Sequence, residues 1–286
     1  MDKKLIFLDI DGTLVAAMAK PSLLAAEAVC KARENGHKVF LCTGRNMPII
    51  GSDILDIGFD GVIASAGGHI EVEEKVIFDR LLSEEVIQEC LSIFHAYGIF
   101  CRIESPEGIF TDPQMERLLR TAKPDQTNSE LIRMQREIEV GIPILPYKEY
   151  PQNGAYKICF TSTTLEAVER AKGYLEDRFS FVVHPYGGSR NCFNGEIIWR
   201  GVDKGKGMER VCQHYGAELE DTIAFGDSMN DYEMMVCAGV SVAMGNACSE
   251  LKQMADVVCK SVEEDGVYYE FQRMGLIHSY LEERIE

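Results

Sequence analysis

The sequence predicts an α/β protein whose core is a doubly wound, Rossmann-like parallel sheet with an inserted α+β cap domain. Short apolar runs that end on polar or glycine residues alternate with helical periodicities at both ends of the chain, which is typical of parallel strands joined by helices. In the middle of the chain, predicted strands follow one another through turns as well as helices. A chain of 286 residues is long enough to bury two cores. We therefore assign residues 1–81 and 198–286 to the core and residues 82–197 to an inserted domain, here called the cap.

The first half of the core begins with an apolar strand that ends at Leu8. Ser22 is a suitable N-cap for a helix over residues 22–35, because apolar residues follow it at helical spacing. Further strands are expected at 38–42 and 61–64, and the partial alternation of residues 70–78 predicts a hairpin.

The cap is expected to begin with a helix after Ser83, followed by strands and helices of mixed order. The predicted cap strands cover residues 99–103, 109–111, 156–160, 179–184 and 192–199. The predicted cap helices cover residues 83–94, 113–122 and 164–178. Residues 123–150 are polar and interrupted by proline, and they predict no regular element.

The βα alternation returns after Val202. It predicts strands at 222–225, 240–243 and 256–259, and helices at 205–215, 230–238 and after Asp265-Gly266. These elements complete the parallel sheet that the N-terminal strands begin.

The composition excludes several classes of partner. A formal net charge of −17 disfavours nucleic acid and anionic membranes, which require basic patches. No apolar run approaches the roughly 20 residues of a membrane helix. The ten cysteines show neither C-x-x-C pairs nor zinc-type spacing, so we expect free thiols and a cytoplasmic protein. No feature of the sequence indicates a protein partner.

The stretch from Lys4 to Leu14 carries the first chemical signal. Its apolar run ends on two carboxylates, Asp9 and Asp11, followed by Gly12. A carboxylate inside a buried strand would be costly, so Asp9 is expected at the C-terminal end of the strand, where open α/β sheets bind ligands. Two acids there repel each other unless a cation lies between them. The alternative is an ordinary strand followed by a turn.

Three predicted core strands end on polar residues that can converge. Asp9, Thr43 and Asp227 each follow a strand, and right-handed connections bring such ends to one edge of the sheet. Carboxylates together with Lys204 match a site for Mg²⁺ and phosphate, in which Asp9 and Asp227 supply side-chain ligands to the metal. With so acidic a chain, a phosphate site has to be made locally by a metal, a lysine and backbone N–H groups.

Four segments in this order resemble the signatures of the haloacid dehalogenase (HAD) superfamily. They are Asp9-Ile10-Asp11-Gly12-Thr13-Leu14, Leu41-Cys42-Thr43-Gly44-Arg45, the segment around Lys204, and Phe225-Gly226-Asp227-Ser228-Met229-Asn230-Asp231. The long insert and Met244-Gly245-Asn246-Ala247 are similar to the Cof-type phosphatases of that superfamily. The resemblance covers essentially the whole chain.

The resemblance implies a Mg²⁺-dependent phosphatase that acts on a small phosphorylated metabolite, with a sugar phosphate as one option. It implies that Asp9 attacks phosphorus to form an aspartyl-phosphate, and that Asp11 acts as general acid and then general base. It also implies that Asp11 binds the metal through its backbone carbonyl. Phosphate contacts are expected from the Thr43 hydroxyl, the Gly44 N–H and Lys204.

The fourth segment adds two expectations. Asn230 would orient Lys204 or the phosphate, and Asp231 would support the metal from behind its ligands. Each of these residues also has a simpler interpretation. Lys204 could be a solvated charge, Thr43-Gly44 a turn, Asn230 and Asp231 helix caps, and Asn246 a turn residue.

One departure from the Cof-type pattern concerns the loop after the third strand. Those chains often carry Asn-Gly there, whereas this chain has Ala66-Gly67-Gly68, so a contact made by that amide cannot be transferred. In the cap, the turn of residues 184–191 contains Arg190, which either contacts substrate or belongs to an ordinary hairpin loop.

Two other functions compete with the phosphatase. A phosphosugar mutase would require a second basic cluster in the cap to hold a bisphosphate. A non-catalytic phosphate-binding module would not require the Asp9 and Asp11 pair, which is present. The identity of the substrate depends on cap side chains that the sequence alone cannot position.

Overall fold

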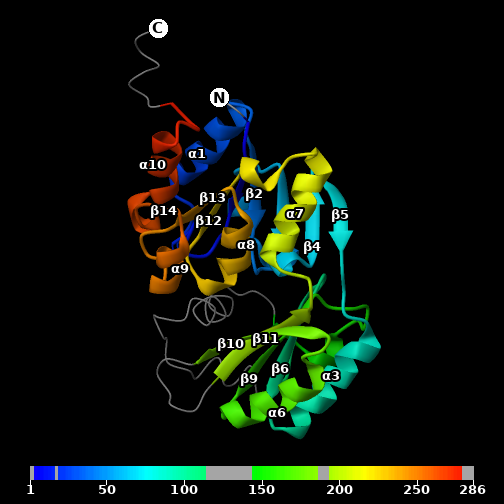
Figure 1. Cartoon of the computed structure of the whole chain (residues 1–286). Helices are drawn as coiled ribbons and strands as arrows, with labels where there is room; N and C mark the ends of the chain where they lie inside the picture. Colours follow the sequence, from blue (N-terminus) through cyan, green and yellow to red (C-terminus); the bar gives the residue numbers. More distant parts are fainter. Residues whose placement is uncertain (1–2, 17–18, 114–143, 186–192, 279–286) are drawn as a thin grey trace. The chain divides into compact units, whose positions relative to one another are not determined.

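The computed structural model describes residues 3–16, 19–113, 144–185 and 193–278. The chain divides into two compact units (Figure 1). The core unit comprises residues 1–45, 50–78 and 203–286, and the cap unit comprises residues 46–49 and 79–202. The predicted helix at 113–122 lies almost entirely outside the described residues, as does most of the turn at 184–191 that contains Arg190.

The core unit contains a sheet of eight strands in the order β14-β13-β12-β1-β2-β3-β4-β5. The strands are β1 (Leu5–Leu8), β2 (Lys38–Cys42), β3 (Gly61–Ala64), β4 (His69–Val72), β5 (Lys75–Asp79), β12 (Thr222–Gly226), β13 (Val240–Ala243) and β14 (Val257–Val258). All pairs from β14 to β3 are parallel, and β4 joins antiparallel to β3. The predicted α/β fold is confirmed, and the predicted hairpin forms the antiparallel edge of the sheet.

Strand β1 lies at the centre of this sheet and joins the two ends of the chain. Leu5 pairs with Lys38 of β2 on one side and with Thr222 of β12 on the other. The side chains of β1 are buried on both faces, which explains why its sequence is a continuous apolar run. The residues that follow β1 and β12 therefore emerge beside each other.

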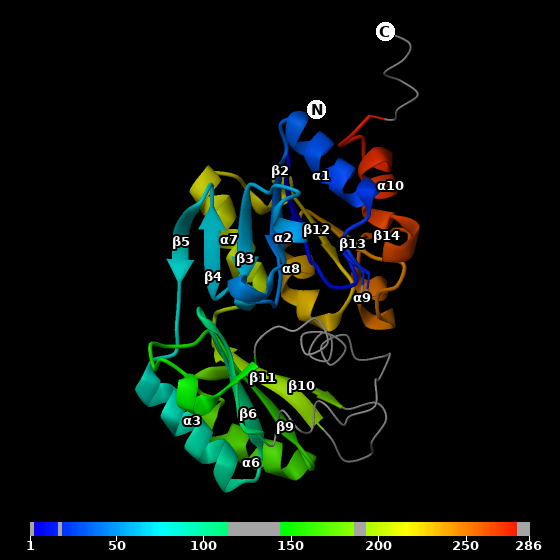
Figure 2. The ribbon, with the colours of Figure 1, turned by 180° about the vertical axis from the view of Figure 1, so that it is seen from behind.

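Helices cover both faces of the core sheet (Figures 1 and 2). The chain passes from β1 to β2 in one direction across the sheet and from β12 to β13 in the other. Right-handed connections therefore place the helices that follow β1 and β12 on opposite faces. The main helices of the core are α1 (Leu23–Glu34), α7 (Lys204–Tyr215), α8 (Tyr232–Cys237), α9 (Ser249–Met254) and α10 (Gly266–Arg273). Helix α1 packs beside α10, and α7 packs beside α8.

Local sequence fixes the ends of these helices. The Ser22 hydroxyl accepts a hydrogen bond from the Ala25 N–H, as its predicted role as N-cap requires. Asp203 caps α7 in the same way, and Gly216 ends it in the left-handed conformation. The predicted helix at 230–238 is instead a short 3₁₀ turn, Met229–Asp231, followed by α8. The side chain of Asp231 bonds back to the start of that turn, which explains the tighter winding.

The cap unit contains a second sheet, in the order β10-β11-β9-β6-β7-β8. Its strands are β6 (Phe100–Ser105), β7 (Gly108–Thr111), β8 (Ile144–Pro146), β9 (Lys157–Ser162), β10 (Phe179–Pro185) and β11 (Phe193–Trp199). Helices α3 (Glu84–Ala96) and α6 (Leu165–Leu175) pack on one face through an apolar cluster that includes Phe94 and Phe160. Strand β8 lies in the segment for which the sequence predicted no element; it pairs in parallel with β7.

The opposite face of the cap sheet carries buried charges. Arg102 contacts Glu104, and Lys157 lies 2.6 Å from Glu196 and 3.5 Å from Glu104. These four side chains alternate along β6, β9 and β11 with residues of the apolar cluster, so strand periodicity places them together. Two positive and two negative charges balance in this group.

Nine cysteines lie within the described residues, and all nine are free thiols. Within the described parts of the chain, no helix combines the length and apolarity that crossing a bilayer requires.

We expect Lys157→Met to destabilise the protein strongly, because it leaves the buried Glu104 and the half-buried Glu196 without their shared cation. Breaking a buried pair by removing one partner typically lowers the free energy of unfolding by about 3–5 kcal/mol. Chemical denaturation measures this change. The matched control is Arg170→Met, which removes an exposed helix pair with Glu166 and should cost less than about 0.5 kcal/mol. Equal losses for both variants would contradict a stabilising role for the buried group.

Candidate active site

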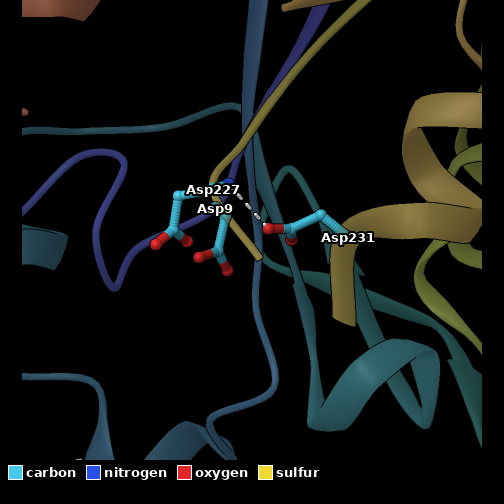
Figure 3. Close-up of side chains that lie close together, drawn as sticks. All are labelled: Asp9, Asp227 and Asp231. Atoms are coloured by element: carbon cyan, nitrogen blue, oxygen red, sulfur yellow. Dashed lines mark hydrogen bonds between the residues drawn. The ribbon is translucent and has the colours of Figure 1, made fainter. Parts of the chain in front are cut away.

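The site lies at the C-terminal ends of β1 and β12, two neighbouring strands of the core sheet. Asp9 directly follows β1 and Asp227 directly follows β12, and both are buried. The Asp9 N–H donates to the Phe225 carbonyl at 3.1 Å, which continues the parallel pairing of the strands past Leu8. Figure 3 shows the Asp9 and Asp227 carboxylates beside each other, with Asp231 opposite.

Lys204 reaches this site from the first residue of α7. Its Nζ lies 2.7 Å from Asp9 Oδ1 and 2.5 Å from Asp231 Oδ1. The lysine side chain is 1% exposed, so the interpretation of Lys204 as a solvated charge does not hold. The start of α7 approaches closely because Gly67 has no side chain, since a Cβ there would lie 2.3 Å from the Asp203 carbonyl oxygen.

Asp231 holds Lys204 and the turn after β12 together. Its Oδ1 binds Lys204, and its Oδ2 accepts a hydrogen bond from the Ser228 N–H at 3.2 Å. Oδ2 also accepts a hydrogen bond from the Asp227 N–H at 3.0 Å (Figure 3). The structure therefore gives the contact with Lys204 to Asp231, whereas Asn230 accepts a bond from the Ser228 hydroxyl. Which of these two neighbours faces Lys204 depends on how the turn is wound, and the sequence alone does not determine that winding.

Arg45 is a site residue to which the sequence analysis gave no role. Its guanidinium binds both carboxylate oxygens of Asp11, with Nε 2.8 Å from Oδ2 and Nη2 2.6 Å from Oδ1. Such a bidentate pair fixes the orientation of the carboxylate as well as its position. A reason to consider Arg45 was present in the sequence, because this residue immediately follows Thr43-Gly44 at the end of β2.

Thr43 and Gly44 lie at the end of β2, next to β1. The Thr43 hydroxyl accepts a bond from the Arg45 N–H at 3.1 Å. A Cβ on Gly44 would meet no heavy atom within 4 Å, so its backbone borders open space.

Gly12, in contrast, is closely packed: a Cβ there would lie 2.2 Å from Asp227 Oδ2, and Gly12 has a φ of 83°. The glycine after Asp11 is thus required for the close approach of the first loop to Asp227.

Asn246 connects two loops around the site. Its amide N–H donates to the Gly12 carbonyl at 2.8 Å, and its Oδ1 accepts from the Val262 N–H at 2.9 Å. Asn246 therefore supports the loop that carries Asp11 and Gly12.

The crowded carboxylates strongly perturb one another. Burial and the nearby Asp231 raise the pKa of Asp9 to about 7, although Lys204 opposes the rise. Burial, Asp231 and Asp9 also raise the pKa of Asp227 well above its ordinary value. Burial acts to lower the pKa of Lys204, but Asp231 and Asp9 raise it well above its ordinary value. The site thus holds more negative charge than one lysine neutralises.

The residues present fit a divalent cation. Asp9, Asp227 and Asp231 offer oxygens within 4.8 Å of one another. Asp227 Oδ1 is buried without a hydrogen-bond partner, whereas both oxygens of Asp231 are already bound by Lys204 and backbone N–H groups. A buried carboxylate oxygen without a partner is costly unless a cation binds it. Asp9 and Asp227 are therefore better placed than Asp231 to bind a metal directly.

A sequence profile of the haloacid dehalogenase-like hydrolases matches residues 6–271. The chain belongs to this family. The match covers the four segments quoted above, and it confirms the resemblance that they predicted.

Characterised relatives and solved structures agree with this assignment. The Bacillus subtilis phosphatase YwpJ is 27% identical over 92% of this chain and 97% of its own length. A B. subtilis enzyme named 5-amino-6-(5-phospho-D-ribitylamino)uracil phosphatase, YwtE, is 26% identical over 93% of this chain and 96% of its own. The solved sugar phosphatase BT4131 is 25% identical with a TM-score of 0.76, covering 96% of this chain and all of that one. The protein is thus a phosphatase of the HAD type.

We expect Asp9→Asn to stabilise the Mg²⁺-free protein at neutral pH and to have less effect in acid. The folded-state pKa of Asp9 is raised from 3.8 to about 7, so the protonated form is favoured on folding. The stabilisation that protonated Asp9 gives the folded protein is fully present below pH 3.8 and is lost as the pH rises through about 7. Asparagine has no charge to desolvate and escapes this loss.

Melting temperatures of both proteins in EDTA, across that pH range, measure the effect. The difference between variant and wild type should grow with pH, and saturating Mg²⁺ should reduce it by favouring the ionised carboxylates. A difference that stays constant with pH would show that Asp9 ionises normally.

Proposed function

We propose that the protein hydrolyses the phosphate monoester of a small phosphorylated metabolite, with Mg²⁺, through an aspartyl-phosphate on Asp9. The observation that carries the proposal is the position of the Asp9 carboxylate, which Lys204 holds at 2.7 Å beside the unpartnered oxygen of Asp227. In this arrangement the proposed nucleophile, a cation and an oxygen available to a metal lie close together. Phosphoryl transfer depends mainly on such positioning and charge neutralisation.

In the first step, an oxygen of Asp9 forms a bond to phosphorus while the bond to the leaving oxygen breaks. Asp11 gives its proton to that leaving oxygen. In the second step, Asp11 takes a proton from the water that attacks phosphorus, which releases phosphate and restores Asp9. Lys204 neutralises charge on the phosphoryl oxygens in both steps, and the Thr43 hydroxyl and Gly44 N–H are available to bind another of them.

Arg45 has a consequence for this sequence of steps. In the arrangement seen here, the guanidinium engages both oxygens of Asp11. Asp11 must therefore separate from Arg45 and take up a proton from solvent before it can protonate a leaving oxygen. An incoming phosphoryl group offers Arg45 an alternative anion to bind.

The metal would be held by the side chains of Asp9 and Asp227 and by the backbone carbonyl of Asp11. Two carboxylates and one carbonyl are a small protein contribution, as Mg²⁺ prefers when it keeps several waters. When bound, the ion supplies charge neutralisation at the phosphoryl oxygens. Asp231 would orient Lys204 and the Asp227 backbone without binding the metal itself.

The proposed substrate is defined only by its class, a small phosphorylated metabolite. The relatives named above act, by their names, on a ribitylamino-uracil phosphate and on a sugar phosphate. A further relative from Yersinia pseudotuberculosis, 26% identical over 87% of this chain, is named HMP-PP phosphatase. Such diversity on one fold favours assigning the reaction class and testing the substrate directly.

The structure offers no support for the mutase alternative. A mutase requires positive charge in the cap for the second phosphate. In the described part of the cap, the buried cations Arg102 and Lys157 are paired with Glu104 and Glu196. The non-catalytic alternative is disfavoured by the engaged Asp11 and by Asp9 placed against Lys204.

Asp9→Asn should abolish phosphatase turnover while leaving the fold intact, because asparagine keeps the shape but cannot attack phosphorus. We expect phosphate release from p-nitrophenyl phosphate and a panel of metabolites to fall by a factor of about 10³ or more. EDTA should silence the wild-type protein, and Mg²⁺ should restore it.

The control is Asp56→Asn, which makes the same change at an exposed carboxylate of the core unit. It should retain wild-type activity. A folded Asp9→Asn protein with near-normal turnover would exclude the aspartyl-phosphate, and full activity in excess EDTA would exclude the metal.

A further inference from the structure

Strand β5 forms the free edge of the core sheet. It is the last strand in the sheet order, after β4, and no other described strand pairs with its outer side. Val76 is 55% exposed, and Ile77 and Phe78 are half-buried. An edge strand with three consecutive apolar residues is a template for pairing with another strand unless something prevents it.

The hairpin turn determines which backbone groups face outward. Glu73 and Glu74 form a two-residue turn with φ of 50° and 63°, the geometry that matches the twist of a tight hairpin. Such a turn is closed by a hydrogen-bonded pair, here Val72 and Lys75. Because hydrogen bonding alternates along an antiparallel strand, Ile77 also faces β4, whereas the N–H and C=O groups of Val76 and Phe78 point away from the sheet.

The sequence of this edge is complementary to itself. When two copies of β5 run antiparallel about Ile77, Lys75 faces Asp79 of the second copy and Val76 faces its Phe78. The outward backbone groups of Val76 and Phe78 then form hydrogen-bonded pairs, which is the alternation that the hairpin requires. The flanking Glu74 and Arg80 also fall opposite each other.

Neighbouring registers lose this match. Shifting the pairing so that Val76 faces Val76 keeps the hydrogen bonds but places Asp79 opposite Glu73 of the second copy, two like charges. The four charges of the edge, Glu74, Lys75, Asp79 and Arg80, sum to zero. The paired segments of residues 74–80 therefore add no net repulsion to that between two chains of net charge −17.

Charged residues often protect a sheet edge from pairing. Here they lie at the two ends of an apolar centre and carry opposite signs, so a second copy neutralises them instead of being repelled. The Arg210 guanidinium lies 3.9 Å from the centre of the Phe78 ring and covers this ring.

We propose that β5 is a self-association surface that joins two copies of this chain through an antiparallel β5–β5 pair centred on Ile77. The pair extends the core sheet across a two-fold axis, so that each contact occurs twice. This inference does not depend on the proposed phosphatase reaction.

The test measures the solution mass of the full chain by light scattering and sedimentation over a wide concentration range. We expect a species of twice 32.0 kDa. Lys75→Asp and Asp79→Lys should each weaken the dimer by about tenfold or more, because two attractive pairs become two repulsive ones. An equimolar mixture of the two variants should form heterodimers, and the double variant K75D/D79K should again form homodimers.

The control is Lys148→Asp, the same charge change at an exposed residue of the cap unit, which should leave the mass unchanged. The Asp79 carboxylate also accepts a hydrogen bond from the Tyr156 hydroxyl, so melting temperature and p-nitrophenyl phosphate turnover verify that each variant is folded. A wild-type protein that stays monomeric overturns the proposal. A dimer unaffected by the single charge changes, or not restored by mixing them, places association on another surface.

Register is tested independently by Ile77→Cys. Residues directly opposite in a pair without hydrogen bonds have Cα atoms about 4.5 Å apart, within the range a disulfide allows. Mild oxidation should therefore link position 77 to position 77 of the second copy, identified by mass spectrometry of the linked peptide. Val76→Cys, which faces Phe78 in this register, should link far less. Equal linking at both positions would overturn the assigned register.

Discussion

The buried contact of Lys204 with Asp9 and Asp231 is the interaction on which the site depends. It ties together the end of the central strand β1, the start of α7 and the turn after β12. All three side chains are almost fully buried, so the charges are little screened, and Lys204 offsets part of the cost of burying the two carboxylates. The site is built where the two halves of the core unit meet.

This arrangement carries a net negative charge that a phosphatase can use. Asp9, Asp227 and Asp231 surround a single lysine, and the raised pKa values of Asp9 and Asp227 show that the protein alone does not stabilise all three ionised carboxylates. In the proposed function, a divalent cation would relieve the repulsion and supply the positive charge that a phosphate ester requires. In a chain as acidic as this one, a phosphate site depends on such local compensation of charge.

The cap shows a different use of buried charge. In the described part of its polar face, two cations balance two carboxylates, so this group has little net attraction for an anion. Recognition of a neutral, hydroxyl-bearing part of a substrate is compatible with such a balance, because it offers both donors and acceptors.

The sequence by itself determined the fold class, the family and the residues at the strand ends. Apolar runs that stop on Asp9, Thr43 and Asp227 carry this information locally, because a strand buried on both faces has to be apolar and its polar end has to mark the edge of the sheet. Tertiary structure decided the partners. Three contacts depend on the directions of side chains. Arg45 binds both oxygens of Asp11, Asp231 rather than Asn230 contacts Lys204, and Asn246 bonds to the Gly12 carbonyl. The partners lie on segments that are far apart in the sequence or in a tightly wound turn. Spacing along the chain does not specify those directions, since they are set only when the strands pair and the turns close.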